Sequence, residues 1–162
     1  MNIKLKSLNI ASYNELDKRQ IRFVKEIKSD PLITYYVTRQ IDKYLDESKE
    51  NDDLMIDAAY IITDKKKPVG FVRLARLNEV GTLELHYGVH PDCRRQGYGS
   101  KILLEVGDYL LNQREYKKIK LDIKENNKGS IKCAIDAKYH FERSISLGYG
   151  ETKILTYTKE RK

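Results

Sequence analysis

One segment, residues 82–101, restricts the fold of this chain more than any other part of the sequence. Residues 82–89 alternate between two faces, with Leu83, Leu85 and Tyr87 on one and polar side chains or glycine on the other, which is the pattern of a β-strand. A basic loop with two glycines follows, and apolar residues then recur at helical spacing. This succession of strand, glycine-containing loop and helix predicts an α/β domain.

Further periodic segments extend this pattern along the chain. Alternation with period two predicts additional strands at residues 3–8, 56–63, 70–77 and 119–123. Helical spacing predicts helices at residues 16–27, 33–45, 98–110 and 127–137. A closing hairpin is expected over residues 139–158, with its turn at 148–150. The predicted order is β-αα-βββ-α-β-α-ββ, a mixed sheet of about six to seven strands flanked by about four helices, in one domain over residues 1–162.

Composition narrows the class of protein. Hydrophobic residues make up 40% of the chain and charged residues 34%, so the chain can bury one core and remain soluble. The longest apolar run, residues 58–63, is too short to span a bilayer, and the first seven residues lack the apolar segment of a signal peptide. Cys93 and Cys133 lie forty residues apart, which excludes a disulfide framework and a four-ligand zinc site. We therefore expect a cytoplasmic protein.

The net charge of +7, from 31 Lys and Arg against 24 Asp and Glu, favours anionic partners. Nucleic acid, acidic lipid and phosphorylated small molecules are all in this class. The cations are spread along the chain, and their densest run, at residues 65–67, is best explained as a solvated hairpin turn.

The segment between the strand and the helix carries the clearest chemical signal. It reads Val-His-Pro-Asp-Cys-Arg-Arg-Gln-Gly-Tyr-Gly-Ser-Lys over residues 89–101. The N-terminus of a helix exposes free N–H groups and the positive end of the helix dipole, and therefore binds phosphate. Gly97 and Gly99 allow the backbone to approach a pyrophosphate closely, and Arg94, Arg95 and Lys101 add neutralising charge.

Three types of phosphate-binding loop compete for this segment. A Rossmann loop requires G-x-G-x-x-G directly after the strand, but Ile102 stands at the third glycine and the loop is too long. A Walker loop requires G-x-x-x-x-G-K-[ST], which the order Gly-Ser-Lys does not match. The third type, R/Q-x-x-G-x-G/A, is the motif of the GNAT superfamily of acyl-CoA N-acyltransferases, and Arg94, Gly97 and Gly99 match it.

The sequence around this loop also resembles the GNAT family over residues 56–158, and the predicted N-terminal strand and two helices agree with the family's order of elements. Residues 84–91, Glu-Leu-His-Tyr-Gly-Val-His-Pro, resemble the E-I-G-Y-x-V-x-P strand of the branch that includes ribosomal-protein N-terminal acetyltransferases. Asn127, Ser130 and Tyr139 match N-x-x-[AS] and the aromatic residue of G-F. The chain departs from the family at three positions, where Gly is replaced by His86, Tyr by Ala134 and Gly by Lys138.

The resemblance implies a GNAT fold that binds acetyl-CoA as co-substrate, with no metal. In this family the strand before the loop splays from its neighbour, and pantetheine inserts between the two strands. The residues implied to contact the cofactor through strand and loop are Tyr87, Gly88, Val89, Arg94, Arg95, Gln96, Gly97, Tyr98, Gly99 and Ser100. Asn127 is either a helix cap or a further contact on the cofactor side.

The implied reaction is direct attack of an amine on the acetyl thioester, which requires removal of a proton from the ammonium group. Glu84 is the candidate base, through water, and the alternative is a sheet carboxylate paired with a cation. His86 lies on the same strand face and either tunes the pKa of Glu84, acts as the base itself or is a packed sheet histidine. The related N-terminal acetyltransferases carry a serine near the sulfur, which makes Ser130 the candidate proton donor or, alternatively, a residue of the first helical turn.

The remaining thiols and imidazoles have simpler interpretations. Arg94 and Arg95 beside Cys93 are expected to lower the pKa of its thiol, but no partner for a covalent route can be identified. Cys133 is expected to be buried in helix packing, and the remaining histidines, His90 and His140, are expected in a loop and at the surface.

Four functions follow from these observations. The leading hypothesis is an N-acetyltransferase that acts on a primary amine of a small molecule, a peptide N-terminus or a lysine. The alternatives are an acetyltransferase toxin acting on aminoacyl-tRNA, a non-catalytic acyl-CoA sensor and a nucleic-acid-binding module. The chain is also compatible with a homodimer.

Overall fold

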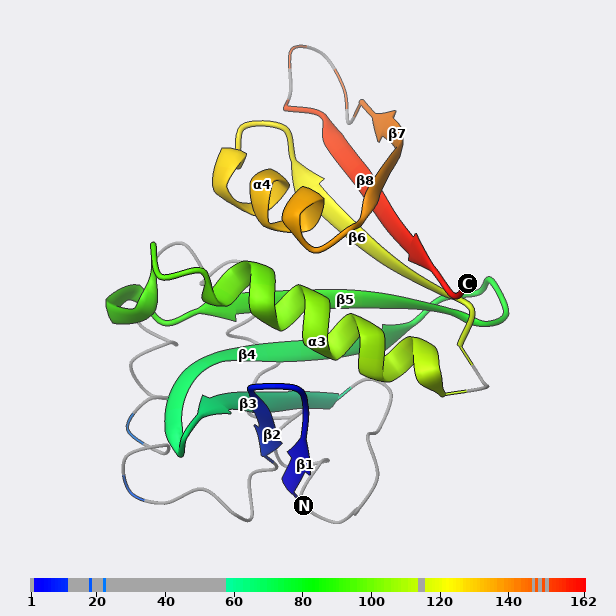
Figure 1. The fold of residues 1–162 in the computed structure, drawn as a ribbon. Coiled ribbons are helices and arrows are strands. Elements are labelled where there is room, and N and C mark those ends of the chain that lie inside the picture. The colour runs from blue at the N-terminus through cyan, green and yellow to red at the C-terminus, as the bar shows by residue number, and fades with distance from the viewer. Residues whose placement is uncertain are drawn as a thin grey trace.

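A computed structural model describes residues 2–11, 18, 22, 58–113, 116–146, 148, 150 and 152–162 of the chain. Eight strands in these ranges form one mixed sheet with the spatial order β1-β2-β3-β4-β5-β6-β8-β7 (Figure 1). The strands are β1 Asn2–Lys4, β2 Asn9–Ala11, β3 Ala58–Asp64, β4 Lys67–Arg76, β5 Thr82–Val89, β6 Lys118–Lys124, β7 His140–Ile145 and β8 Ile154–Glu160. The helices are η2 Pro91–Cys93, α3 Tyr98–Asn112 and α4 Lys128–Asp136.

The first strand was predicted wrongly, because residues 3–8 do not form one continuous strand. They belong to a tight hairpin in which β1 pairs antiparallel with β2, and the Leu5 N–H donates to the Leu8 carbonyl at 2.8 Å. Glu105 of α3 holds this turn, since its carboxylate accepts from the Ser7 hydroxyl at 2.6 Å and from the Leu8 N–H at 3.1 Å. A partner 98 positions away in sequence has no signature in local periodicity.

The central strands agree with the prediction. β3, β4 and β5 form an antiparallel meander, and β5 has the predicted bounds. Lys65 and Lys66 form the exposed β3–β4 turn with φ of 48° and 70°, which confirms a solvated hairpin turn for that run of lysines.

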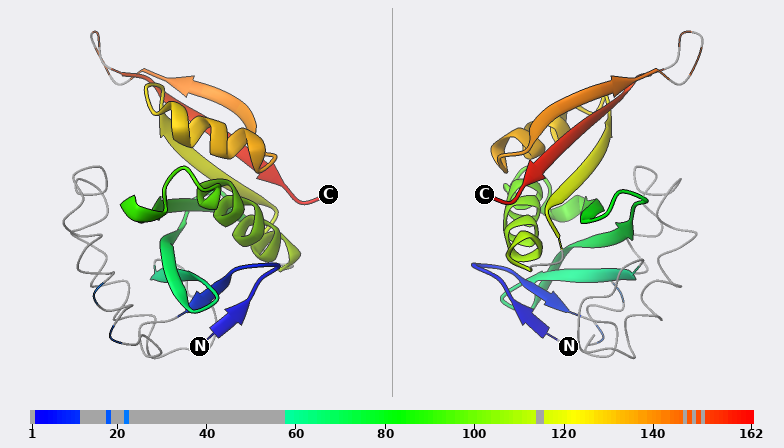
Figure 2. Two further views of the ribbon diagram at one scale, coloured as in Figure 1. Left: turned by 60° about the vertical axis from the view of Figure 1, so that its left-hand side comes forward. Right: turned by 90° about the vertical axis from the view of Figure 1, so that its right-hand side faces the viewer.

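Helix α3 covers one face of the sheet and builds the core there. It contacts β4, β5 and β6, and Figures 1 and 2 show it lying along these strands, with α4 beside it. Leu74, Leu83, Ile102 and Val106 in this layer are at most 1% exposed. The alternation along β5 therefore places Leu83, Leu85 and Tyr87 on the helix-covered side of the sheet.

The sheet divides where β5 meets β6. These parallel strands pair only at three positions, Thr82 with Lys118, Leu83 with Ile119 and Glu84 with Lys120. Beyond Glu84 the two strands diverge, and β6 continues with β8 and β7 as a separate antiparallel half (Figure 1). One edge of β5 is consequently left without a strand partner from Leu85 to Val89 among the described residues.

The structure adds one strand to the predicted count and confirms the mixed α/β character. The eighth strand arises because the N-terminal segment is a hairpin. The helices predicted at 127–137 and 98–110 are present as α4 and α3. Of the helix predicted at 16–27, Lys18 and Arg22 are helical; the rest of it and the helix predicted at 33–45 lie outside the described residues.

A matched pair of glycine substitutions tests the packing of α3. Gly107 lies inside α3, where a Cβ would lie 2.6 Å from the Tyr139 hydroxyl oxygen; Tyr139 is 2% exposed and its hydroxyl donates to the Leu103 carbonyl. We expect Gly107→Ala to lower the free energy of unfolding by about 1–2 kcal/mol, because overpacking exceeds the gain in helix propensity of about 1 kcal/mol. Gly129→Ala in α4 meets no atom within 4 Å and is expected to stabilise the protein slightly. Chemical denaturation measures both, and an equal gain from the two variants would contradict the close contact.

Candidate functional site

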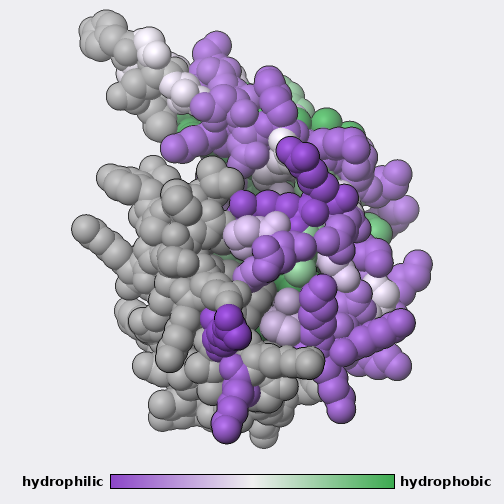
Figure 3. All heavy atoms as spheres, turned by 90° about the vertical axis from the view of Figure 1, so that its left-hand side faces the viewer, coloured by the Kyte–Doolittle hydropathy of each residue, from purple (hydrophilic) through white to green (hydrophobic). Residues whose placement is uncertain are grey.

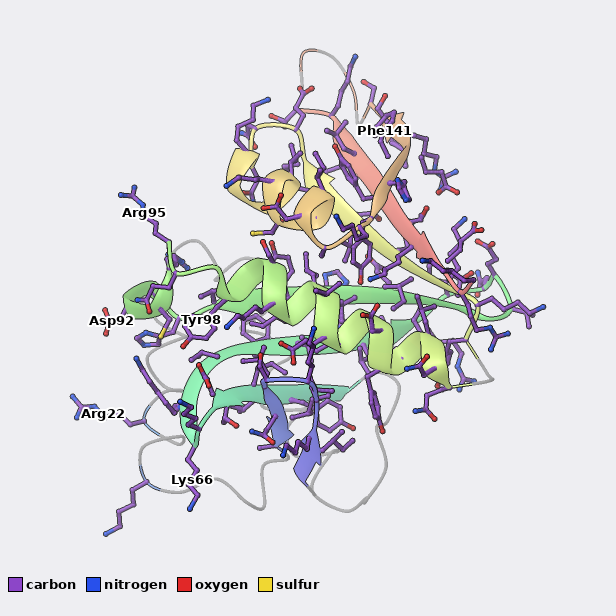
Figure 4. All side chains as sticks on the ribbon, viewed as in Figure 1. Arg22, Lys66, Asp92, Arg95, Tyr98 and Phe141 are labelled. Carbon is purple, nitrogen blue, oxygen red and sulfur yellow. The ribbon has the colours of Figure 1, made fainter. Side chains whose placement is uncertain are left out.

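The loop between β5 and α3 presents an uncapped helix N-terminus. Gly97 is the N-cap residue of α3 with φ of 82°, and no side chain caps the helix at this position. The first-turn N–H groups of an α-helix have no partner within the helix, so they point outwards with the positive end of the dipole. Arg95 and Asp92 project from this end of the molecule (Figure 4), and the first turn of α3 contains no acidic residue. This arrangement is suited to bind a phosphate.

Three hydrogen bonds fix the geometry of this loop. The His90 N–H donates to the Val69 carbonyl at 2.9 Å, and His90 Nδ1 accepts from the Asp92 N–H at 3.1 Å. The Tyr98 hydroxyl donates to Asp64 Oδ2 at 2.7 Å, and this bond raises the pKa of Tyr98 to about 12. His90 is therefore a buried N-cap of the short helix η2 rather than a free loop residue.

Cationic side chains surround this end of the fold. Arg95, Lys65, Lys66 and Lys67 are exposed, and the Asp64–Tyr98 hydrogen bond links the lysine turn to the first residue of α3. The described residues at this side of the molecule present a mostly hydrophilic surface (Figure 3). An anion that approaches the helix N-terminus therefore meets positive charge from two separate segments.

The unpaired edge of β5 begins beside this loop. Tyr87, Gly88 and Val89 are bonded to β4 on one side, and their other side faces the divergence of β5 and β6. An extended ligand with amide groups can pair with such an edge in the way that an added strand does. The strand residues and the loop residues that were predicted to contact the cofactor therefore lie next to each other in the structure.

Glu84 and His86 form a hydrogen-bonded pair on the opposite face of the sheet from α3. Their Oε1 and Nε2 atoms are 3.2 Å apart, and the side chains are 19% and 32% exposed. The His86 hydrogen bond is the main cause that lowers the pKa of Glu84, with further contributions from Lys120 and Arg73, while burial acts in the opposite direction. Glu84 is therefore a carboxylate at neutral pH, and cations lie beside it, as the interpretation of a paired sheet carboxylate expected.

Sequence reasoning did not identify the strand neighbours of this pair. Arg73 of β4 lies opposite His86, and Lys120 of β6 lies opposite Glu84. Lys120 Nζ is 3.2 Å from Asp122 Oδ2, and the Thr156 hydroxyl donates to the same carboxylate at 2.8 Å. Strand register decides which residues meet here, and no local pattern reveals a register across a crossover.

Helix α4 places a second polar pair at the same divergence. Asn127 is its N-cap, and the side-chain oxygen accepts from the Ser130 N–H at 3.2 Å. The Ser130 hydroxyl lies 2.8 Å from the Tyr87 hydroxyl of β5. Ala134 is completely buried. Asn127 therefore acts as a cap, and the hydroxyl of Ser130 is engaged across the gap rather than in capping.

The prediction for the Cys93 thiol was wrong. Cys93 is 2% exposed, and burial raises the pKa of its thiol, which outweighs the effect of nearby Lys67. Cys133 is only partly buried, contrary to expectation, and lies beside Tyr87 and Gly99. His140 is exposed, as predicted.

No group of three or more His, Cys, Asp or Glu side chains in the described ranges is arranged to hold a metal ion. None of the helices described here is long and apolar enough to cross a membrane.

Comparison with known proteins agrees with this geometry. The sequence profile of the acetyltransferase (GNAT) family matches residues 21–137 of the chain. No curated protein matches the chain.

Solved structures of low sequence identity share the fold. An acetyltransferase of the GNAT family from Bacillus anthracis superposes with a TM-score of 0.77 at 14% identity, covering 99% of both chains. A spermidine N-acetyltransferase from Vibrio cholerae, in complex with CoA and spermine, gives 0.73 at 12% identity and covers 96% of both chains. RimL, an alpha-N-acetyltransferase of a ribosomal protein in complex with coenzyme A, gives 0.71 at 13% identity, covering 99% of this chain and 98% of that one.

Removing the imidazole of His86 tests the Glu84–His86 pair. We expect His86→Ala to raise the pKa of Glu84, because the variant loses the largest contribution that lowers it. A carboxyl group whose pKa is lowered in the folded state stabilises the fold at pH values above its ordinary pKa of 4.5. This stabilisation is lost as the pH falls below 4.5 and the carboxylate is protonated. The variant has less of it to lose, so we expect its acid-unfolding midpoint at a higher pH. Carbon-13 NMR titration of the carboxyl groups measures the pKa, with exposed His140→Ala as the matched control. An unchanged Glu84 pKa would exclude His86 as its main partner.

Proposed function

Because the chain belongs to the GNAT acetyltransferase family, we propose that it transfers an acetyl group from acetyl-CoA to a primary amine by direct attack within a ternary complex. The observation that carries this proposal is the unpaired edge of β5 ending beside an uncapped helix N-terminus. A ligand with a pyrophosphate joined to an extended chain of amides fits both features at once.

The chain's own residues suit each part of this ligand. The amides of residues 95–100, with Arg94 and Arg95, are positioned to hold the pyrophosphate, and the backbone of Tyr87 to Val89 is positioned to pair with the pantetheine amides. No metal is needed, because the helix N-terminus and the cations supply the positive charge.

Glu84 is proposed as the base that removes a proton from the acceptor ammonium group, through a water molecule. A carboxylate that keeps its charge attracts the ammonium form of the acceptor and orients the water that carries the proton away. His86, which donates to the carboxylate in this geometry, holds Glu84 in place and keeps it ionised. Ser130, on the other side of β5, is proposed to act on the departing thiolate.

The surroundings of Glu84 restrict the acceptor. The structural neighbours include a spermidine N-acetyltransferase and an aminoglycoside acetyltransferase in complex with coenzyme A and kanamycin. Arg73 and Lys120 lie beside Glu84 in this chain and repel a polycation. We therefore favour an acceptor with few positive charges, which is a small amine, a peptide N-terminus or a lysine side chain.

A tRNA-linked acceptor is the second candidate, and the cations beside the loop favour it. Lys65, Lys66 and Arg95 are exposed at the end of the fold where the unpaired edge of β5 opens. Affinity for tRNA that falls steeply with salt, together with acetylation of an aminoacyl-tRNA, would support this candidate. For both candidates we propose a cytoplasmic location, supported by the two free cysteines in a reducing compartment.

Calorimetric titration tests the cofactor assignment. Acetyl-CoA is expected to bind saturably at one site per chain, while ATP and dephospho-CoA serve as comparison ligands. Gly97→Val should abolish binding, because valine strains a backbone with φ of 82° and places its side chain beside the N–H groups that receive the pyrophosphate. Gly150→Val, at φ of 66° in the turn between β7 and β8, is the matched control and should bind normally. Normal binding by Gly97→Val would exclude this loop as the phosphate site.

Removing the charge of Glu84 tests the base. Glu84→Gln is expected to lower kcat about 100-fold while acetyl-CoA affinity changes by less than about twofold, because the side chain is needed for proton removal and not for the cofactor. Thiol release in a screen of amines measures kcat, and Glu79→Gln at an exposed turn is the control. Undiminished turnover would exclude Glu84 from proton removal.

A further inference from the structure

The position that many family members fill with tyrosine offers no hydroxyl group here. Ala134 is completely buried and belongs to the hydrophobic core between α4 and the sheet. A departing thiolate at the divergence of β5 and β6 therefore needs a hydrogen-bond donor from another position.

The Tyr87–Ser130 pair lies at this divergence. Tyr87 belongs to the unpaired stretch of β5 and Ser130 to the first turn of α4, so their hydrogen bond of 2.8 Å joins the two elements that border the gap. The backbone N–H of Ser130 is already directed to Asn127. The side-chain hydroxyl of Ser130 is therefore the group of this residue that can donate a hydrogen bond to a ligand.

Each hydroxyl group in the pair has one hydrogen. The Tyr87 hydroxyl has two hydrogen-bond neighbours, the Ser130 hydroxyl and the Cys133 thiol. A phenol is a stronger donor than an aliphatic hydroxyl, and a thiol sulfur is only a weak acceptor, so the favoured arrangement has Tyr87 donating to Ser130. The hydrogen of Ser130 is then left for a third group. A chain of this kind polarises each member and strengthens the terminal donor.

The ring of Tyr87 is held in place. A Cβ built on Gly99, in the first turn of α3, would lie 3.5 Å from the ring and 2.7 Å from Cys133 Sγ. The absence of a side chain at Gly99 therefore lets Tyr87 and Cys133 pack against the helix that is proposed to bind the pyrophosphate. Burial raises the pKa of Tyr87, so the phenol stays protonated and acts as a hydrogen-bond donor rather than as a source of protons.

We infer that Tyr87 is a positioning residue whose hydroxyl orients the Ser130 hydroxyl hydrogen towards the sulfur of coenzyme A, so that the thiolate departs hydrogen-bonded. This inference rests on the proposed function, because it requires coenzyme A in the gap between β5 and β6. It assigns to the Tyr87 side chain a role separate from the backbone pairing of the same residue.

The thiol of bound coenzyme A provides a test that does not depend on the acceptor. The ultraviolet absorbance of the thiolate is followed against pH in protein saturated with coenzyme A, with protein saturated with desulfo-coenzyme A as the blank. This blank subtracts the absorbance of Cys133, which also faces Tyr87, and of Cys93. We expect the bound thiol to titrate about one pKa unit below the thiol of free coenzyme A, measured in the same buffer.

The variants separate orientation from packing. Tyr87→Phe keeps the ring and should return the bound thiol pKa most of the way to its free value, as should Ser130→Ala. The double variant should show no larger shift than Ser130→Ala alone, because both substitutions break one chain of hydrogen bonds. Ser130→Thr should retain the lowered value, and Tyr109→Phe in α3 should leave it unchanged.

The outcomes distinguish this inference from the proposed function. If the protein does not bind coenzyme A, the proposed function fails. If it binds but the thiol titrates at its free value, or if Tyr87→Phe leaves a lowered value unchanged, the role of Tyr87 is overturned. Fully additive shifts in the double variant would also overturn it, since Tyr87 would then act independently of Ser130. Should Tyr87→Phe fail to fold, Tyr87→Met, which also lacks the hydroxyl group, replaces it, and an unchanged pKa of the bound thiol in that variant would overturn the role of Tyr87.

Discussion

Backbone hydrogen bonding at the edge of β5 is the constraint on which the functional site depends. A strand inside a sheet normally has partners on both sides, and polar backbone groups without partners are unfavourable away from water. β5 pairs with β4 along its length, but β6 leaves it after Glu84. In the part of the chain that the structure describes, backbone donors and acceptors of β5 therefore lie without a strand partner, next to a helix N-terminus that no side chain caps.

One hydrophobic core joins the two parts of the sheet on either side of the divergence. α3 contacts β4, β5 and β6, and the hairpin of β1 and β2 is fixed to that helix by Glu105. β6, β8 and β7 form their own antiparallel ladder. Tyr139 reaches from the end of α4 to the Leu103 carbonyl of α3 and packs against Gly107. Contacts between helices therefore join the two parts of the sheet beyond the three positions at which β5 and β6 pair.

Local patterns predicted the elements well where the physical cause was local. Strand β5, helix α3 and the hairpin at Lys65 were correctly placed, because alternation, helical spacing and turn chemistry act within a few residues. The first strand was predicted wrongly because Glu105, far away in sequence, determines where the chain turns. The thiol of Cys93 was misjudged for a related reason. Its arginine neighbours are adjacent in sequence, whereas its environment is the buried interior.

The candidate site shows the same division between local and long-range causes. The loop residues from Arg94 to Ser100 could be proposed from the sequence because the candidate phosphate site lies within a single turn of backbone. The pairs around β5 could not be found in this way. Arg73 faces His86, and Tyr87 meets Ser130, only after strands and helices have been assembled.

Side chains of β5 alternate between the two faces of the sheet, so the residues proposed for two different chemical steps lie on opposite faces. Glu84 and His86 point to the face away from α3, where proton removal from an acceptor is proposed, and Tyr87 points to the helix-covered face, where it meets Ser130. A carboxylate base and a hydrogen-bond-donating hydroxyl placed side by side on one face would compete with their ligands by hydrogen-bonding to each other. With the strand between them, both groups border the same gap without contact. The replacement of tyrosine by Ala134 is compatible with this arrangement, because a hydroxyl delivered from β5 and α4 reaches the gap independently of that position.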